Sequence, residues 1–329
     1  MQTTESPWQA AADAIEAARK ILAVSHIAPD GDAVGSLLGI SETMRALGKD
    51  VTAVIDDGVP PALQFVPQSA TILPGIDAGE FDLMITVDSS DLERIGVAGA
   101  YGMAHSKEII NLDHHPTNTR YGNINLVVSH AVAAAEIVFD LVNYIRCQLT
   151  EAAAYALLTG LVTDTQGFRI SATNDRTLEI ARALMQFGAP LSQIMAQTLN
   201  RRPYQEVVLW KLVFPSVAIS DGLIHAAITR DNITQAGLDA MTDGGLVSHL
   251  VNVDQAKVSI VFKELSDLQV EVGFRSKPGY DVASLAVQLG GGGHTQASGC
   301  TMDGTLAQVR STVLPLAHQI ISARDSELV

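Results

Sequence analysis

The chain has 329 residues, of which 47% are hydrophobic and 17% are charged. This composition is typical of a soluble globular enzyme, and the length exceeds the size at which one hydrophobic core usually stops growing, so we expect two domains. The formal net charge is −15. This argues against a protein that wraps long duplex DNA, because such binding depends on a basic surface.

The start of the chain predicts no targeting segment. Residues 8–20 read as an amphipathic helix and not as the apolar centre of a signal peptide. No run of about 18 apolar residues occurs, so we expect no membrane span. Cys147 and Cys300 lie far apart and match no zinc-binding spacing. Two reduced thiols in a cytoplasmic protein are the simplest interpretation.

The first half of the chain alternates strands with helices, and this predicts a parallel sheet with helices on both faces. In such a sheet, ligands bind at the carboxyl ends of the strands. We expect Asp32 to cap the first long helix of this domain. The expected strands are 21–25, 51–55, 83–87 and 108–112, and the expected helices are 32–47, 132–144 and 151–163.

The second half has a different pattern, with helices first and then mostly strands. Helices at 174–187 and 191–199 lead to a hinge at 200–203. We therefore expect a catalytic domain over 1–190, a helical connector over 191–212 and a smaller mixed α/β domain over 213–329. The expected strands of this smaller domain are 214–219, 223–229, 257–262 and 268–274, and its expected helices are 281–289 and 305–321.

Four short motifs place acidic and histidine side chains after predicted strands or at a helix end. HIAPDGDAVGS follows the strand 21–25, VDSSD contains the end of 83–87, NLDHHPTN follows 108–112, and TGLVTDTQGFR ends the helix 151–163. The sheet predicts that these positions share one edge. The residues that the motifs contribute are His26, Asp30, Asp32, Asp88, Asp113, His114, His115 and Asp164.

This set of side chains suits a pair of divalent ions. Two ions about 3.5–4 Å apart can hold both the attacking and the leaving oxygen of a phosphoryl transfer. Mixed imidazole and carboxylate ligands favour Mn²⁺, Fe²⁺, Co²⁺ or Zn²⁺ over a pure-oxygen Mg²⁺ site. Taken singly, an Asp after a strand is more often a helix cap, and a lone His is more often structural. The joint placement of all four motifs on one sheet points to a metal centre.

The four motifs, in this order, closely resemble those of the DHH phosphoesterases. The segment GFRSKPGYDVASLAVQLGGGGHTQASG, residues 273–299, resembles the glycine-rich motif of the DHH-associated C-terminal domain. The resemblance covers roughly residues 15–325. Within the superfamily, the two-domain layout and TGLVTDTQGFR look most like the cytoplasmic nanoRNase and pAp-phosphatase group. RecJ-like nucleases are usually longer.

The resemblance implies a role for each motif residue. Asp88 would bridge the two ions, and the nucleophile would be the bridging water or hydroxide. Asp113 would orient a neighbouring ligand, and His115 would face the substrate phosphate as a hydrogen-bond donor or acid. We expect Mn²⁺, with Mg²⁺ or Co²⁺ as alternatives. The ligands would be His26, Asp30 and Asp88 for one ion, and Asp32, Asp88, His114 and Asp164 for the other.

Substrate-binding residues are expected in the second domain. The run of glycines at 290–293 permits close approach of backbone N–H groups to an anion, and Arg275 can grip a phosphate with two hydrogen bonds. The resemblance implies that Arg275, Gly291, Gly292, Gly293 and His294 hold the substrate across an interdomain cleft. One departure from the pattern is Gln166, which stands where relatives often carry glycine.

The expected function is metal-dependent hydrolysis of short oligoribonucleotides and of 3′-phosphoadenosine 5′-phosphate to mononucleotides. Three alternatives stay open. They are a phosphodiesterase for linear or cyclic dinucleotides, a pyrophosphatase or polyphosphatase, and a nucleotide sensor without activity. We expect no long duplex DNA and no membrane as partners, and a homodimer fits the base rates for cytoplasmic enzymes.

Overall fold

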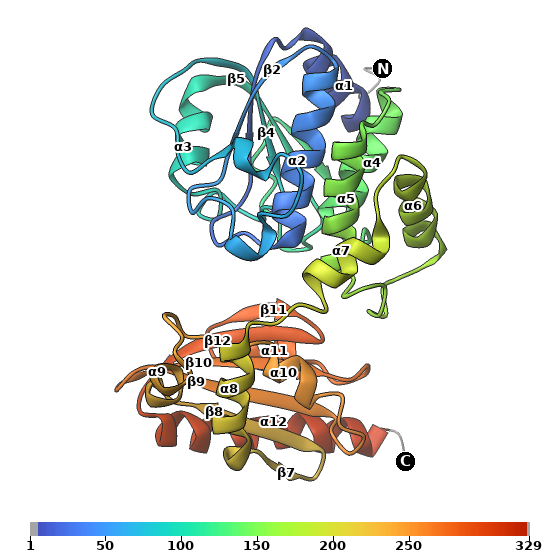
Figure 1. Cartoon of the computed structure of the whole chain (residues 1–329). Coiled ribbons are helices and arrows are strands. Elements are labelled where there is room, and N and C mark those ends of the chain that lie inside the picture. The colour runs from blue at the N-terminus through green and yellow to red at the C-terminus, as the bar shows by residue number, and fades with distance from the viewer. Residues whose placement is uncertain (1–5, 328–329) are drawn as a thin grey trace, which may run out of the picture. The chain divides into compact units, whose positions relative to one another are not determined.

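The computed structural model describes residues 6–327. Contacts between Cα atoms divide the chain into a first unit that ends at Arg201 and a second that begins at Arg202 (Figure 1). The first unit contains a six-stranded parallel sheet and the second a six-stranded mixed sheet. The α/β class with two different sheets, which the sequence predicted, is thereby confirmed.

The sheet of the first unit has the strand order β3-β2-β1-β4-β5-β6, and all its neighbours pair in parallel. The order reverses between β1 and β4, so the switch point of the sheet lies at the carboxyl ends of these two strands. The strands are β1 (Lys20–Val24), β2 (Asp50–Val54), β3 (Ile72–Leu73), β4 (Phe81–Val87), β5 (Ser106–Asp113) and β6 (Ile124–Val127).

Helices cover both faces of this sheet because successive strand residues point to opposite sides. In β1, Ile21 and Ala23 pack into the core with α1, α2, α4 and α5, whereas Leu22 and Val24 pack with α3 (Figure 1). Runs that are apolar on both faces are typical of parallel strands. The helices are α1 (Pro7–Ala17), α2 (Gly31–Ala46), α3 (Gly96–His105), α4 (Ala134–Tyr144), α5 (Glu151–Asp164), α6 (Asp175–Gln186) and α7 (Leu191–Thr198), with 3₁₀ turns at Pro61–Leu63 and Ser69–Thr71.

Helices α2 and α5 approach each other through glycines. Gly31, Gly35 and Gly39 repeat every fourth residue along one face of α2. A Cβ atom built on Gly35 would lie 2.4 Å from the carbonyl oxygen of Ala156 and 2.7 Å from the backbone nitrogen of Gly160 in α5. Only glycine fits such a backbone contact. This close contact brings the start of α2 and the end of α5 to the same place.

The second unit has the strand order β11-β12-β10-β9-β8-β7, in which β8 and β9 are parallel and the other neighbours antiparallel. Its two apolar clusters lie on opposite faces of this sheet, one including α11 and α12 and the other including α8, α9 and α10. The strands are β7 (Ala218–Ser220), β8 (Leu223–Ile228), β9 (Val258–Ser266), β10 (Gln269–Ser276), β11 (Gly292–His294) and β12 (Ala297–Asp303). The helices are α8 (Tyr204–Val213), α9 (Arg230–Ala236), α10 (Leu246–Leu250), α11 (Val282–Gln288) and α12 (Leu306–Glu327), with a 3₁₀ turn at Phe214–Ser216.

One sequence prediction in this unit is wrong. The expected strand 214–219 begins as a 3₁₀ turn, because Pro215 cannot donate to a ladder, and pairing starts only at Ala218. Within the glycine run, Gly292 and Gly293 form β11 with His294. Among residues 6–327, no helix has the length and apolar character that a membrane crossing requires.

Candidate metal centre

The first motif follows β1, at the switch point of the sheet. The hydroxyl of Ser25 donates to the carbonyl of Val87 at 2.9 Å and so ties the ends of β1 and β4 together. Asp30 caps α2, since its carboxylate accepts from the backbone nitrogens of Asp32 and Ala33 at 3.0 Å. The prediction that Asp32 is the cap is therefore wrong.

Asp32 instead turns its side chain inward, where it is fully buried. Its carboxylate accepts from the hydroxyl of Ser36 at 2.9 Å and from the backbone nitrogens of Ala134 and Ala135 at the start of α4. These donors come from the positive end of a helix, which favours a carboxylate. Asp32 thus connects α2 to α4 and keeps a fixed orientation.

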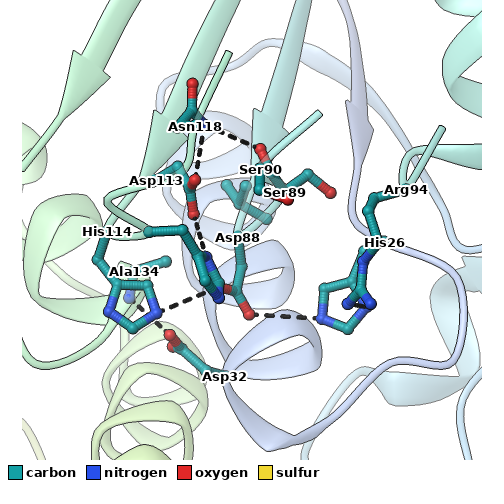
Figure 2. A network of polar contacts seen from close by, with 12 residues as sticks. His26, Asp32, Asp88, Ser89, Ser90, Arg94, Asp113, His114, Asn118 and Ala134 are labelled. Carbon is teal, nitrogen blue, oxygen red and sulfur yellow. Dashed lines mark hydrogen bonds and ion pairs between the residues drawn. The ribbon is translucent and has the colours of Figure 1, made fainter. Parts of the chain in front are cut away.

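Asp88 lies at the centre of the cluster, directly after β4 (Figure 2). Its φ of 56° is in the left-handed region, which costs a non-glycine residue roughly 1–3 kcal/mol. The backbone nitrogen of Asp88 donates to Leu112 at 2.9 Å and holds this geometry. One oxygen lies 3.6 Å from Nε2 of His26, and the other, Oδ1, lies 3.5 Å from Nε2 of His114.

These separations suit metal ligands better than hydrogen bonds. Two ligands of one ion stand about 3–3.5 Å apart, because each bond is roughly 2.0–2.2 Å long. Oδ1 of Asp88 is buried and accepts no hydrogen bond from the described residues. A buried carboxylate oxygen without a donor is costly, and a bound cation would satisfy it.

Three overlapping groups of side chains in residues 6–327 could hold an ion. Within each group the ligand atoms lie within 4.8 Å of one another. Asp88 belongs to two of the groups, and so does His114, whose Nε2 is 3.4 Å from Asp164. The groups are His26, Asp30 and Asp88; Asp32, His114 and Asp164; and Asp88, His114 and His115.

Burial and mutual repulsion perturb the ionisation of this cluster. Burial raises the pKa of Asp32 well above its usual value and that of Asp164 to about 7. Burial would also raise the pKa of Asp88, but the imidazoles of His114 and His26 outweigh it and hold this pKa below its usual range. Burial would lower the pKa of His114, yet Asp88, Asp164 and Asp32 raise it to about 10. The concentrated negative charge is what divalent cations would neutralise.

A second network supports His115. Its Nδ1 lies 2.8 Å from Oδ1 of Asp113, which is fully buried at the end of β5. The amide of Asn118 donates to the other oxygen of Asp113 at 2.6 Å and to the carbonyl of Ser89 at 3.0 Å (Figure 2). Asp113 therefore contacts His115 and does not belong to any of the three groups. Asn118 was not identified from the sequence, although NLDHHPTN contains it.

Gln166, which stands where relatives often carry glycine, lies in a turn whose backbone favours glycine. Gln166 has a φ of 50° and is followed by Gly167 at 73° and Phe168 at 66°, directly after Asp164 and Thr165. Glycine adopts this region without the penalty that a side chain brings. The hydroxyl of Thr165 accepts from the backbone nitrogen of Phe168 at 3.0 Å and holds the turn.

The substrate residues expected in the second unit lie near one another. Ala297 of β12 pairs with Arg275 of β10 on one side and with His294 of β11 on the other. Residues directly opposite in a ladder point to the same face, so Arg275 and His294 share a face of this sheet. Nε of Arg275 is buried and has no hydrogen-bond partner among the described residues. Gly291, Gly292 and Gly293 precede His294 along this edge.

Two family models match the chain. The model of the DHH family, N-terminal domain, matches residues 20–161, and that of the DHHA1 domain matches residues 221–323. The fold resembles a crystal structure titled as an exopolyphosphatase-related protein from Bacteroides fragilis, with a TM-score of 0.86. That alignment covers 97% of this chain and 98% of the other at 23% identity.

Curated relatives extend the match over most of the chain. A protein of Thermus thermophilus named bifunctional oligoribonuclease and PAP phosphatase NrnA is 32% identical over 86% of this chain and 84% of its own length. A Bacillus subtilis protein of the same name is 30% identical over 84% of this chain and 87% of its own. The motif resemblance is confirmed, and the chain belongs to the DHH phosphoesterases that carry a DHHA1 domain.

Proposed function

We propose that this phosphoesterase hydrolyses very short oligoribonucleotides and 3′-phosphoadenosine 5′-phosphate to mononucleotides. The observation that carries the proposal is the set of overlapping His and Asp groups around Asp88, whose buried Oδ1 has no hydrogen-bond partner among the described residues. Similarity over most of the chain to two relatives named as oligoribonuclease and PAP phosphatase supports the substrate class. The net charge of −15 disfavours long polyanions.

Each ligand would come from a fixed element of the first unit. Asp88 would bridge two divalent ions, most suitably Mn²⁺, with His26 and Asp30 on one side and Asp32, His114 and Asp164 on the other. The chemistry that such a pair supplies is the activation of water as a nucleophile and the neutralisation of phosphate charge. The left-handed backbone of Asp88 keeps its two oxygens directed at His26 and His114 before any substrate arrives.

His115 is proposed to handle the proton of the leaving group. Its Nδ1 faces Asp113 at 2.8 Å, so a proton on this nitrogen is stabilised by the carboxylate. Donation from the Nε2 position of the imidazolium to the leaving oxygen would then complete hydrolysis. Asp113 would hold the ring in place, and Asn118 would hold Asp113.

Arg275 and His294 are proposed to bind the nucleotide. The unpaired buried Nε of Arg275 is a donor that a phosphate oxygen would satisfy. The neighbouring Gly291, Gly292 and Gly293 carry no side chain that would block the approach of a phosphate to the backbone.

Parallel turnover assays with Mn²⁺ test this function. The substrates are a 5′-phosphorylated diribonucleotide, a long single-stranded RNA, 3′-phosphoadenosine 5′-phosphate, pyrophosphate and a cyclic dinucleotide. The matched control is Asp88→Asn, which keeps the size of the side chain and tolerates the left-handed backbone but removes the charge. We expect the diribonucleotide and 3′-phosphoadenosine 5′-phosphate to be hydrolysed by the natural protein and not by the variant.

Other outcomes would replace the proposal with a defined alternative. Hydrolysis of pyrophosphate alone would indicate a pyrophosphatase. Preference for the cyclic dinucleotide would indicate a signal-degrading phosphodiesterase. Cleavage of the long strand as fast as the dinucleotide would contradict the restriction to short substrates.

A further inference from the structure

Arg94 lies beside the metal centre in a loop between β4 and α3, and no sequence motif drew attention to it. Two hydrogen bonds of the Arg94 backbone hold this loop. The backbone nitrogen of Arg94 donates to the carboxylate of Asp91 at 3.0 Å, and its carbonyl accepts from the backbone nitrogen of Ile27 at 2.9 Å. The loop is therefore held through the main chain of Arg94. The exposed Arg94 side chain is not needed to build it.

The guanidinium contacts the ring of His26 on the side away from Asp88 (Figure 2). Nη2 of Arg94 lies 2.9 Å from Nδ1 of His26, and the carbonyl oxygen of Ile27 lies 2.7 Å from the same nitrogen. A carbonyl can only accept, so Nδ1 carries a hydrogen that it donates to Ile27. This tautomer leaves the lone pair of the neutral ring on Nε2, which faces the carboxylates of Asp88 and Asp30.

It follows that Arg94 cannot donate to His26. A guanidinium N–H and the Nδ1–H are both donors, and an arginine has no acceptor. The contact at 2.9 Å is therefore a proximity of two donors and does not satisfy Arg94. If Nε2 of His26 bound a cation, the ring would have no lone pair left in its plane. His26 could then accept no hydrogen bond from Arg94 at either nitrogen.

The charge of Arg94 is also not matched by an ion pair. Within residues 6–327, no carboxylate lies within 4.0 Å of its guanidinium nitrogens. Asp91, an acid of the same loop, uses its oxygens for the hydroxyl of Ser90 and the backbone nitrogens of Glu93 and Arg94. An exposed cation without a carboxylate partner among the described residues thus lies one imidazole ring away from the candidate metal ligands.

We propose that Arg94 binds a phosphate oxygen of the substrate at the metal centre. The proposal rests on the function proposed above and adds a phosphate-binding residue from the catalytic unit to Arg275 in the other unit. A phosphate anion would offer its oxygens to this exposed cation, and the planar guanidinium can donate two parallel hydrogen bonds to it. The ligand class is a nucleotide phosphomonoester or phosphodiester.

The test compares Arg94→Gln and Arg94→Lys with Arg182→Gln, an exposed arginine of α6 outside the cluster. Three quantities are measured on the full chain. They are kcat/KM for the 5′-phosphorylated diribonucleotide, the affinity for adenosine 5′-monophosphate with Mn²⁺ present, and the affinity for Mn²⁺ alone. Calorimetry gives the last two without turnover.

We expect Arg94→Gln to lower both kcat/KM and the affinity for adenosine 5′-monophosphate by on the order of ten- to a hundredfold, the usual effect of removing a charged hydrogen-bond donor. Arg94→Lys should restore part of the loss, because it keeps the charge without the planar fork. The affinity for Mn²⁺ should change by no more than about twofold, and Arg182→Gln should behave as the natural protein.

Two results would overturn the proposal. One is an unchanged kcat/KM and nucleotide affinity in Arg94→Gln. The other is a loss of Mn²⁺ affinity that parallels the loss of activity, since Arg94 would then act by orienting His26. If the natural protein hydrolyses no substrate, the proposed function fails, and the affinity for adenosine 5′-monophosphate still decides the role of Arg94.

Discussion

Three residues other than glycine adopt a left-handed backbone next to the candidate metal centre. Ala28 in the first motif, Asp88 after β4 and Gln166 after α5 have φ values of 52°, 56° and 50°. Each conformation is held by a neighbour, such as the carboxylate of Asp57, which accepts from the nitrogen of Ala28 at 2.7 Å. Strain of this kind persists where the surrounding structure fixes side chains for binding or catalysis.

Gln166 offers a test of that strain. We expect Gln166→Gly to raise the free energy of unfolding by about 0.5–1 kcal/mol, because the left-handed penalty of a side chain exceeds the extra backbone entropy of glycine. Urea denaturation measures the change. Gln193→Gly, at an exposed position within α7, should lower the free energy of unfolding instead, since glycine costs about 1 kcal/mol in a helix. Destabilisation by Gln166→Gly would show that the side chain compensates for its strain.

The sequence predicted which His and Asp side chains cluster, but not how each of them is oriented. Asp30 and Asp32 stand two residues apart in one motif, and either can cap a helix. Asp32 points inward because the nitrogens of Ala134 and Ala135, which lie far along the chain, offer it donors. Arg94 and Asn118 were missed for the same reason, since folding alone brings them beside His26 and Asp113.

At the scale of elements, the apolar runs and turn residues predicted most of the first unit. The run Phe81–Val87 is an interior strand because both of its faces are covered. Helix α3 was missed because GVAGAYGMAH contains three glycines and has low helix propensity. Packing of Ala98 on the sheet and capping of the nitrogens of Val97 and Ala98 by Asp56 stabilise it.

The glycine contact between α2 and α5 makes a prediction about the site. We expect Gly35→Ala to lower the free energy of unfolding by roughly 1–3 kcal/mol, because the added Cβ would meet backbone atoms of α5. The helices must move apart, and they carry Asp32 and Asp164, so the affinity for Mn²⁺ should fall as well. Urea denaturation measures the stability of Gly35→Ala, and titration calorimetry measures its affinity for Mn²⁺.

The matched control is Ser41→Ala, a buried position in the same helix. In this variant the helix keeps its glycines and loses only a hydroxyl that has no hydrogen-bond partner among the described residues. We expect its Mn²⁺ affinity to equal that of the natural protein. Equal affinities in Gly35→Ala and Ser41→Ala would contradict the view that this helix contact positions the ligands.

The packing of β8 against α12 predicts a pH dependence of stability. His225 in β8 is buried, its Nδ1 has no hydrogen-bond partner among the described residues, and Arg310 and His318 of α12 face it. Burial, with the charges of Arg310 and His318, lowers the pKa of His225 below its usual value of 6.5. The unfolded chain therefore binds a proton at His225 more tightly than the folded chain does. The contribution of neutral His225 to stability is complete above the pKa of the unfolded chain and is lost as the pH falls through the lowered pKa of the folded chain.

We expect His225→Leu to be less sensitive to acid than the natural protein. The loss in melting temperature between about pH 7.5 and pH 5.5 should be smaller in the variant, because one proton-linked penalty has been removed. Differential scanning calorimetry of both proteins across this range makes the measurement. Identical pH profiles would show that His225 does not contribute to acid sensitivity.

At the scale of the whole molecule, the chain consists of two units with separate cores. The motif order predicted the sheet edge at which the His and Asp side chains gather, since His26 and Asp88 follow the two strands at the switch point. The substrate surface that the glycine-rich segment predicts in the second unit stays a prediction, and the structure shows that Arg275 and His294 share Ala297 as a neighbour. The strand β11 within that segment was not predictable, because glycine has low strand propensity and pairing with β12 alone creates it.

The central claim is that Asp88 joins two divalent ions into one hydrolytic centre. The most direct test is to add Mn²⁺ stepwise to chelator-treated protein while counting bound ions and following hydrolysis of the 5′-phosphorylated diribonucleotide. We predict that hydrolysis appears as the second equivalent of Mn²⁺ binds, and that Asp88→Asn binds fewer ions and stays inactive. Full hydrolysis by the chelated protein, or by Asp88→Asn, would contradict the claim.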